Sequence, residues 1–190
     1  MKFDQWLKKY FKNSTESKTN LEESFFAINK STAVYALSAD PPTWGHADIM
    51  MRAAKKFSKV YWVIGVNPKK QSMFSTDQKK LMLEAYIKHY KLENVQVDYF
   101  EGSIAKYCKE KNARFLIRGL RSSSDFQMEY ELSVGNRGIN KELETICMFT
   151  KPHYATISSS IVRELTQLDE KISQYVHPEV ERLIHESIKK

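Results

Sequence analysis

The sequence predicts an α/β fold: a Rossmann-like, doubly wound and mostly parallel sheet in a single domain. From residue 33 onward, short apolar runs rich in β-branched residues alternate with amphipathic stretches of about ten residues or more. Connections of that length allow the crossover helices that join parallel strands. The chain has 190 residues, 42% of them hydrophobic, which is enough for one domain with a substantial core.

The strands are expected at residues 33–37, 60–66, 95–99, 115–117 and 145–149. One helix is expected to start near Gly45, three more to cover about 76–90, 104–111 and 122–137, and a further helix to start at Ser158. Ser75 or Thr76 can cap the helix at 76–90. In such a sheet a ligand binds at the carboxyl ends of the strands, where the strand order reverses.

Residues 1–31 are predicted to be a helical extension and linker, ahead of a domain that covers 32–190. The first twelve residues carry aromatic and apolar side chains at helical spacing among lysines: Phe3, Trp6, Leu7, Tyr10 and Phe11. A polar linker and a second short helix at 21–28 follow. We expect this extension to pack on the domain's own surface or across a subunit contact.

The formal net charge of +7 suits either a nucleic-acid surface or a pocket for small anions. Basic and acidic residues are interleaved and no arginine-rich arm is present, so small anionic substrates explain the charge as well as a nucleic acid does, and the charge by itself decides little. The partners that we predict are small anionic substrates, with no nucleic acid and no membrane. No run approaches a membrane span and no signal-peptide core is present, which predicts a cytoplasmic protein. Cys108 and Cys147 match no disulfide or zinc pattern, and both are expected to be buried.

Polar side chains gather after four of the predicted strands, and the fold would turn all of them toward one crevice. In chain order these residues are Ser38, Asp40, Thr43 and His46, then Asn67, Lys69 and Lys70, then Arg118, Gly119 and Arg121, then Lys151, His153, Tyr154 and Ser158–Ser160. The crevice would hold several cations, two histidines and a serine-rich helix N-terminus, with no carboxylate pair for hydrolysis.

Such a set of residues suits phosphoryl or nucleotidyl transfer, in which the protein positions anions and neutralises developing charge. Arg118 and Arg121 can each grip a phosphate with a planar fork, and Lys70 can act as a mobile point charge. Serines at a helix start offer hydroxyls and amides to phosphate oxygens. The alternative is that the arginines bind Glu129 or Asp125 and only stabilise the fold.

Three segments resemble the nucleotidyltransferases with a T/HxGH motif: the stretch ending in Gly45-His46, Arg118-Gly119-Leu120-Arg121, and Ile157-Ser158-Ser159-Ser160. Within that group the chain is most similar to the phosphopantetheine adenylyltransferase family. The likeness covers residues from about 32 to the C-terminus. It implies transfer of the adenylyl group of ATP to 4′-phosphopantetheine, giving dephospho-coenzyme A and pyrophosphate, with Mg²⁺ accompanying ATP and a homo-oligomer, a hexamer in the family.

The resemblance also assigns roles to individual residues. It implies His46, Lys70 and Arg118 as catalytic residues, with His46 on the α-phosphate. It implies an acceptor site made of Ser38, Lys70, Ile104 and Arg118. It implies an ATP site made of Ser38, His46, Gly119, Arg121, Glu129, Ser158, Ser159 and Ser160. No protein ligand of a metal is implied.

Three further interpretations stay open at this stage. One is nucleic-acid binding driven by the charge of +7, which predicts an affinity that falls steeply with salt. The chain could transfer a nucleotidyl group to another small phosphate, such as nicotinate mononucleotide or glycerol 3-phosphate. It could instead be a nucleotide- or coenzyme A-binding relative with weakened catalysis, although the presence of both His46 and Lys70 favours an enzyme.

Overall fold

The computed structural model describes residues 30–188, and a five-stranded sheet in the order β3-β2-β1-β4-β5 forms its centre. Every neighbouring pair of strands is parallel, which confirms the predicted Rossmann-like sheet. The strands are β1 (Thr32–Leu37), β2 (Lys59–Val66), β3 (Val95–Glu101), β4 (Phe115–Leu120) and β5 (Glu144–Phe149).

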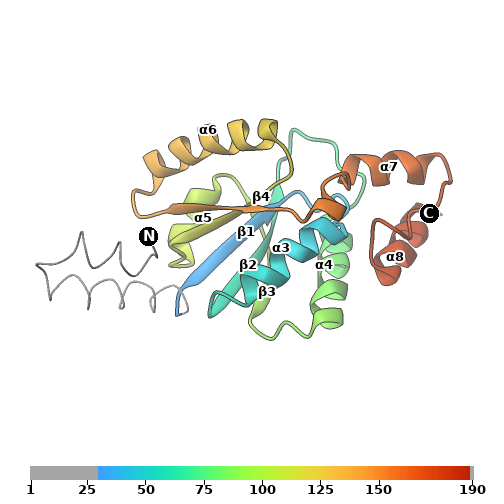
Figure 1. Ribbon diagram of the computed structural model, residues 1–190, viewed down its shortest axis with the longest axis horizontal. Coiled ribbons are helices and arrows are strands. Elements are labelled where there is room, and N and C mark those ends of the chain that lie inside the picture. Colours follow the sequence, from blue (N-terminus) through green and yellow to red (C-terminus); the bar gives the residue numbers. More distant parts are fainter. Residues whose placement is uncertain (1–29, 189–190) are drawn as a thin grey trace, which may run out of the picture.

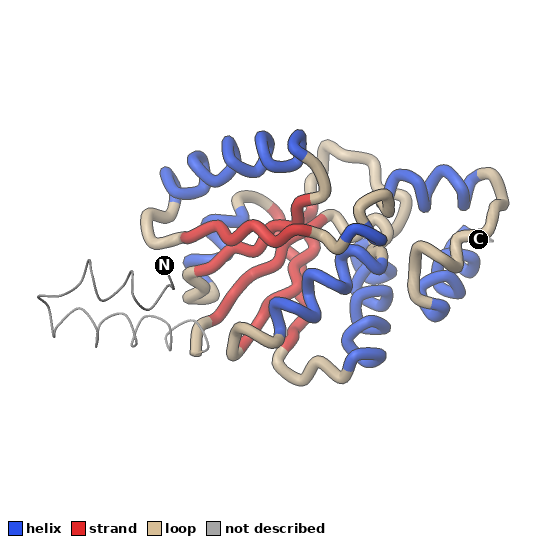
Figure 2. The backbone as a smooth tube through the Cα atoms, in the orientation of Figure 1, coloured by secondary structure: helices blue, strands red, loops and turns tan. Residues whose placement is uncertain are grey.

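Helices connect the strands and cover both faces of the sheet (Figures 1 and 2). The helices are α3 (Trp44–Ala54), α4 (Thr76–Tyr90), α5 (Ile104–Glu110), α6 (Ser123–Ile139), η1 (Pro152–Tyr154), α7 (Ser159–Gln167) and α8 (Pro178–Ile188). Helices α3 and α4 contact one face, α5 and α6 contact the other, and α8 packs against α4. Figure 1 shows α7 and α8 beyond the carboxyl ends of the strands.

Two cores hold these layers together. The larger lies between the sheet and helices α3 and α4, and it buries Trp62, Met50 and Tyr86. The smaller lies on the opposite face, under α5, and it buries Val34 and Leu116. Burial on both faces explains why the central strands read as continuous apolar runs in the sequence.

The strand order reverses between β1 and β4: β2 and β3 follow on one side of β1, and β4 and β5 follow on the other side. The loops that follow β1 and β4 therefore leave the sheet side by side on opposite faces, and they open a crevice between them. The candidate residues after β1, β4 and β5 meet at this point.

Strand β4 is longer than the sequence predicts. It continues to Leu120, so Arg118 and Gly119 lie inside the strand and only Arg121 follows it. Arginine and glycine have weak strand preference, which is why pattern alone ended this strand at residue 117. Pairing of Arg118 with Cys147 and of Gly119 with Met148 extends the strand.

Other local predictions have mixed outcomes. Ser75 caps α4, and its Oγ accepts the amide N–H of Gln78. Cys108 is buried as expected, but Cys147 is exposed because it lies on the edge strand β5. The helices predicted at 1–12 and 21–28 lie outside the described residues. Within residues 30–188, no helix is long and apolar enough to cross a membrane.

Candidate active site

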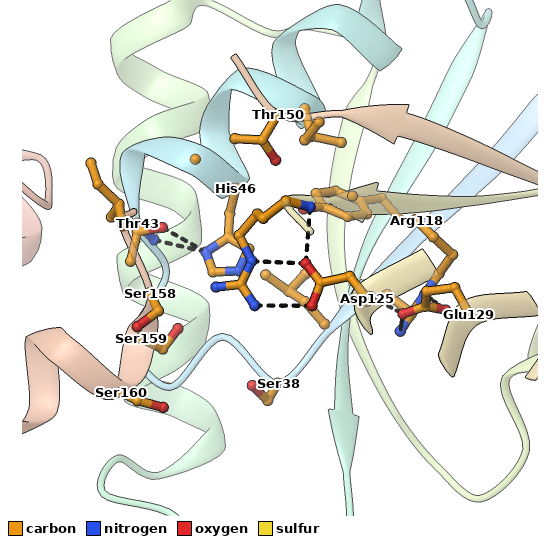
Figure 3. A pocket seen from close by; sticks show the side chains of 18 of the residues that line it. Ser38, Thr43, His46, Arg118, Asp125, Glu129, Thr150, Ser158, Ser159 and Ser160 are labelled. Carbon is orange, nitrogen blue, oxygen red and sulfur yellow. Dashed lines mark hydrogen bonds and ion pairs between the residues drawn. The ribbon is translucent and has the colours of Figure 1, made fainter. Parts of the chain in front are cut away.

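His46 lies in the first turn of α3, and Thr43, the residue that precedes this helix, fixes its ring. The Thr43 amide N–H donates to His46 Nδ1 over 3.0 Å, and Thr43 Oγ1 lies 3.0 Å from the same nitrogen. Because Nδ1 accepts a hydrogen bond from the amide, the ring proton of neutral His46 is on Nε2. Figure 3 shows this ring beside the hollow that Ser38, Arg118 and the serines of α7 surround.

His46 is neutral over the physiological pH range. Burial lowers the pKa of this histidine to about 4, and the nearby positive charge of Arg121 lowers it in the same direction. A neutral imidazole with its proton on Nε2 is a hydrogen-bond donor toward the cavity. It can therefore stabilise an oxygen that gains negative charge during a reaction.

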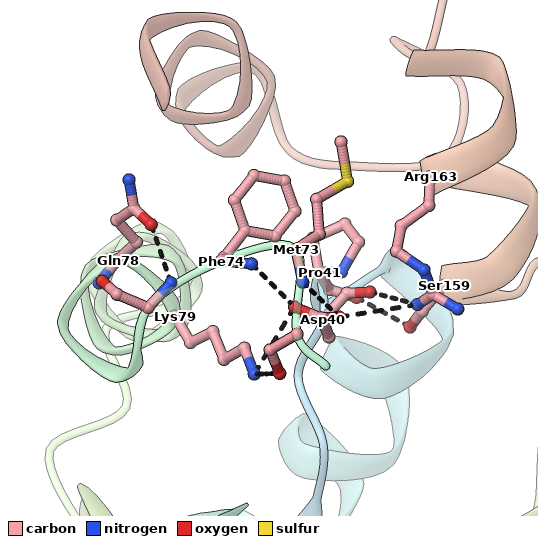
Figure 4. Close-up of polar contacts among 10 residues, drawn as sticks. Asp40, Pro41, Met73, Phe74, Gln78, Lys79, Ser159 and Arg163 are labelled. Carbon is pink, nitrogen blue, oxygen red and sulfur yellow. Dashed lines mark hydrogen bonds and ion pairs between the residues drawn. The ribbon is translucent and has the colours of Figure 1, made fainter. Parts of the chain in front are cut away.

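Asp40 joins the loop after β1 to the loop after β2 (Figure 4). Its carboxylate oxygens accept the amide N–H groups of Met73 and Phe74, each over 3.1 Å. Lys79 Nζ lies 3.4 Å from Asp40 Oδ1. The Asp40 carbonyl accepts a hydrogen bond from Arg163 Nη1 over 2.5 Å. Asp40 thus holds three segments against the turn that leads to His46.

Arg118 is held by a bidentate ion pair on the α6 side of the sheet. Its Nε and Nη2 donate to the two carboxylate oxygens of Glu129 over 2.6 and 2.5 Å. Its Nη1 donates to the carbonyl of Ala36 over 2.9 Å. Glu129 is only 5% exposed, so this pair neutralises a buried carboxylate. The structure thus shows the arginine–glutamate contact that the sequence left as an alternative.

Arg121 is more accessible than Arg118. Its side chain is 42% exposed, and its Nε lies 3.2 Å from Asp125 Oδ2. The Arg121 backbone N–H also donates to this carboxylate over 2.9 Å. Because the Arg121–Asp125 pair is partly in water, an incoming phosphate can displace the carboxylate at small energetic cost.

Gly119 allows α3 to approach β4. A Cβ at this position would lie 3.4 Å from Ile49 Cγ1 and 3.6 Å from the Tyr35 hydroxyl. Both distances are those of ordinary van der Waals contact, the first at the short end of that range. Helix α3 therefore lies close against β4 at this glycine, with room for little more than a methyl group.

The serines at 158–160 form the start of α7. Ser158 caps the helix and accepts the amide N–H of Ile161 over 3.2 Å. Ser159 Oγ donates to the carbonyl of Pro41 over 2.8 Å, which ties α7 to the loop after β1. The free amides at a helix N-terminus and the positive end of its dipole favour an anion there.

Two cavities adjoin at this end of the sheet. The His46 cavity has a volume of about 330 Å³ and the Lys70 cavity about 980 Å³. Both are lined by Ser38 and Arg163, which lie at their junction. The predicted residues that line the His46 cavity are Ser38, His46, Arg118, Gly119, Arg121, Glu129, Ser158, Ser159 and Ser160.

The structure separates two of the predicted acceptor residues from this group. Lys70 lines only the Lys70 cavity. Ile104 lines neither cavity; it packs against the smaller core, because α5 starts on the opposite face of the sheet from α3.

Sequence reasoning missed Arg163. This residue lines both cavities, and its Nη2 donates to Ser160 Oγ over 3.2 Å. Its spacing of three from Ser160 on a predicted helix was a usable signal, because residues at that spacing share a helix face. Thr43 and Asp40 were noted at the end of the first strand, but their supporting contacts come from tertiary structure.

The site does not offer a cage of protein ligands for a metal ion. Across residues 30–188 there is no group of three or more histidine, cysteine, aspartate or glutamate side chains that could hold one. The cavity carboxylates Asp125 and Glu129 are paired with arginines.

Comparison with known proteins identifies the family. Residues 35–165 match the cytidylyltransferase-like family model. The phosphopantetheine adenylyltransferase of Caldanaerobacter subterraneus subsp. tengcongensis is 38% identical over 158 residues, which are 83% of this chain and 98% of that protein. The phosphopantetheine adenylyltransferase of Staphylococcus haemolyticus is 38% identical over 161 residues, 85% of this chain and 99% of that protein. The chain thus belongs to the cytidylyltransferase-like nucleotidyltransferases and, within them, to the phosphopantetheine adenylyltransferases.

Solved structures support the fold. A nicotinate-nucleotide adenylyltransferase described as putative, from Vibrio parahaemolyticus, aligns with a TM-score of 0.64 and 18% identity, over 83% of this chain and 93% of that one. The nicotinic acid mononucleotide adenylyltransferase of Plasmodium falciparum, complexed with NaAD, aligns with a TM-score of 0.64 and 17% identity, over 83% of this chain and 95% of that one. At this identity the likeness is one of fold.

Proposed function

We propose that this protein transfers the adenylyl group of ATP to 4′-phosphopantetheine and releases pyrophosphate. This is the activity for which the two relatives described above are named. The observation that carries the proposal is the junction of the two cavities. A neutral donor, His46, stands in the smaller cavity with two arginines and a serine-rich helix N-terminus. The larger cavity, with Lys70 at its wall, opens directly beside it.

The proposed reaction places ATP in the His46 cavity and the acceptor phosphate at the junction. Arg121 and the start of α7 bind the β- and γ-phosphates, and His46 Nε2–H donates to the α-phosphate as it gains charge. Arg118 and Lys70 orient the acceptor phosphate, whose oxygen attacks the α-phosphorus while the bond to pyrophosphate breaks. Mg²⁺ entering with ATP would supply positive charge to the leaving pyrophosphate, beside Arg121 and the start of α7.

The proposed role of Arg118 requires that its guanidinium still has donors for the acceptor phosphate. Its guanidinium already makes three hydrogen bonds, to Glu129 and to Ala36. It therefore meets the acceptor through its remaining N–H groups, or it exchanges part of the Glu129 contact for phosphate. Gly119 contributes by letting α3 approach β4, and Glu129 contributes by holding Arg118. A role for Ile104 requires that the acceptor reach beyond both cavities.

The test is acceptor-dependent release of pyrophosphate from ATP and Mg²⁺. We expect release with 4′-phosphopantetheine and little with nicotinate mononucleotide or glycerol 3-phosphate. Release with another acceptor would assign the chain to a different substrate within its family. Binding of ATP without release for any acceptor would identify a relative that has lost catalysis. The cytoplasmic location and the homo-oligomeric state stay predictions.

A further inference from the structure

Tyr35 carries a hydroxyl group that has no hydrogen-bond partner within residues 30–188. This tyrosine lies in β1 and is only 3% exposed. Two other buried tyrosines use their hydroxyls: Tyr86 donates to the carbonyl of Pro42 over 3.4 Å, and Tyr107 donates to Asp98 over 2.8 Å. Burying a hydroxyl without a partner costs free energy. The Tyr35 hydroxyl therefore indicates a partner that the domain itself does not supply.

The Tyr35 hydroxyl lies at the wall of the His46 cavity. Tyr35 lines this cavity together with Ile49 of α3 and Gly119 of β4. A Cβ on Gly119 would lie 3.6 Å from the hydroxyl and 3.4 Å from Ile49 Cγ1, so these three residues meet at one place. Behind the hydroxyl, the phenol ring packs nearly parallel to Trp62, with ring centroids 6.3 Å apart. The core thus holds the ring, and its polar end meets the cavity.

The hydroxyl of Tyr35 stays protonated and neutral. Burial raises the pKa of Tyr35 well above its ordinary value, although the positive charges of Arg118 and Arg121 lower it. A neutral tyrosine hydroxyl can both donate and accept a hydrogen bond. It therefore matches an uncharged polar group of a ligand, whereas arginines and helix N-termini are the groups that match phosphate.

The place of Tyr35 along α3 separates it from the residues that would bind phosphate. In the proposed function His46 contacts the α-phosphate, and Arg121 with the start of α7 binds the β- and γ-phosphates. Ile49, beside the Tyr35 hydroxyl, follows His46 by three residues, which is about 5 Å further along the helix. Apart from the hydroxyl, the wall at this place is apolar. The part of ATP on the other side of the α-phosphate is the nucleoside.

We propose that the Tyr35 hydroxyl hydrogen-bonds the nucleoside of ATP, which makes Tyr35 a nucleotide-binding residue. This contact rests on the proposed function, which sets the orientation of ATP in the cavity. A nucleotide that fills the cavity displaces water from the hydroxyl, so one that offers a polar atom there binds more tightly than one that does not. Tyr35 thus adds selection for the nucleoside to a site whose charged residues select phosphate.

The first test compares Tyr35→Phe with Tyr86→Phe in the full-length chain, by thermal unfolding and by calorimetric titration with ATP and Mg²⁺. Because Tyr35→Phe removes an unpaired hydroxyl, the Tm of the free protein should stay within about 1 °C of the wild type or rise. The Kd for ATP should increase about three- to tenfold, as expected for one lost hydrogen bond.

Tyr86→Phe is the matched control, because the Tyr86 hydroxyl is used inside the domain. It accepts the His177 amide N–H over 3.1 Å, and Tyr86 lines neither cavity. This variant should show the opposite pattern. Its Tm should fall by about 2–4 °C, and its Kd for ATP should stay within about twofold of the wild type.

A second test locates the contact on the nucleotide. AMP carries the nucleoside and the α-phosphate, whereas pyrophosphate carries no nucleoside, and the affinity of each can be measured by displacement of bound ATP. Tyr35→Phe should weaken AMP by the same factor as ATP and leave pyrophosphate unchanged. With saturating ATP and 4′-phosphopantetheine, its kcat should stay within about twofold of the wild type, because a nucleoside contact is made equally in the ground state and the transition state.

An unchanged Kd for ATP in Tyr35→Phe would overturn this contact and leave the proposed function standing. Equal weakening of pyrophosphate, or a large loss of kcat, would place the contact on the phosphates and would also overturn it. The expected loss of ATP and AMP affinity in a wild-type protein that releases no pyrophosphate with any acceptor would support the contact and contradict the proposed function.

Discussion

Replacing His46 with alanine tests the geometry of the smaller cavity most closely. Thr43 occupies Nδ1, so Nε2–H is the donor that the ring can offer to a substrate. Burial keeps the pKa of the ring near 4, so the donor is neutral and does not bind ground-state phosphate as a charge. Its contribution should therefore appear mainly in the transition state. Loss of one such donor raises the barrier by about 3 kcal/mol, which is a rate loss of about 150-fold.

The assay is steady-state pyrophosphate release with ATP and 4′-phosphopantetheine, analysed for kcat and KM separately. We expect His46→Ala to lower kcat by about two orders of magnitude while KM for ATP changes by less than about fivefold. His153→Ala is the control, because His153 is exposed and lines neither cavity. A kcat for His46→Ala within a few-fold of the wild type would refute the role of the Nε2 donor.

Three further predictions follow from individual contacts. The pKa of His46 is lowered from 6.5 to about 4 in the folded protein, so the histidine of the unfolded chain is protonated first as the pH decreases, and the folded state loses stability from about pH 6.5 toward pH 4. Between pH 7.5 and pH 5 the free energy of unfolding of the wild type should decrease by about 2 kcal/mol more than that of His46→Ala. Gly135→Ala, with open space around it, should stabilise α6 by about 1 kcal/mol in thermal unfolding, whereas Gly119→Ala, which lies in a strand and places its methyl group in ordinary contact with Ile49, should change stability by less than about 1 kcal/mol. Arg121→Ala should raise KM for ATP and change stability by less than about 1 kcal/mol, whereas Arg118→Ala should destabilise by about 3–5 kcal/mol because it leaves Glu129 buried without a partner. Steady-state kinetics and melting curves for both variants test this difference, and the same behaviour of the two variants would contradict it.

The sequence is enough to predict the layers of this fold because local and global signals agree. Val34 and Trp62 lie in apolar runs that are buried on both faces, and Ser75 marks the start of α4 with its own side chain. The end of β4 was missed because Arg118 and Gly119 join the strand through pairing with β5, which no local signal reports.

The sequence predicts the site residues that directly follow strands, but it does not predict which side chains those residues bind. His46 and the serines at 158–160 sit at helix starts, and the fold brings them together once the sheet is parallel. The partners of Arg118 and Asp40 could not be ranked from the sequence, because ion pairs across the domain depend on packing. Ile104 was assigned by resemblance alone, and the structure packs it in the smaller core.

The central claim, transfer of an adenylyl group, can be tested directly with labelled ATP. One sample of ATP carries the label in the α-phosphate and another in the γ-phosphate, each incubated with Mg²⁺, 4′-phosphopantetheine and the full-length chain. The account predicts that the α label appears in the acceptor product and that the γ label is released in pyrophosphate. A γ label on the acceptor, or an α label that never leaves ATP while the folded protein binds both substrates, would contradict it.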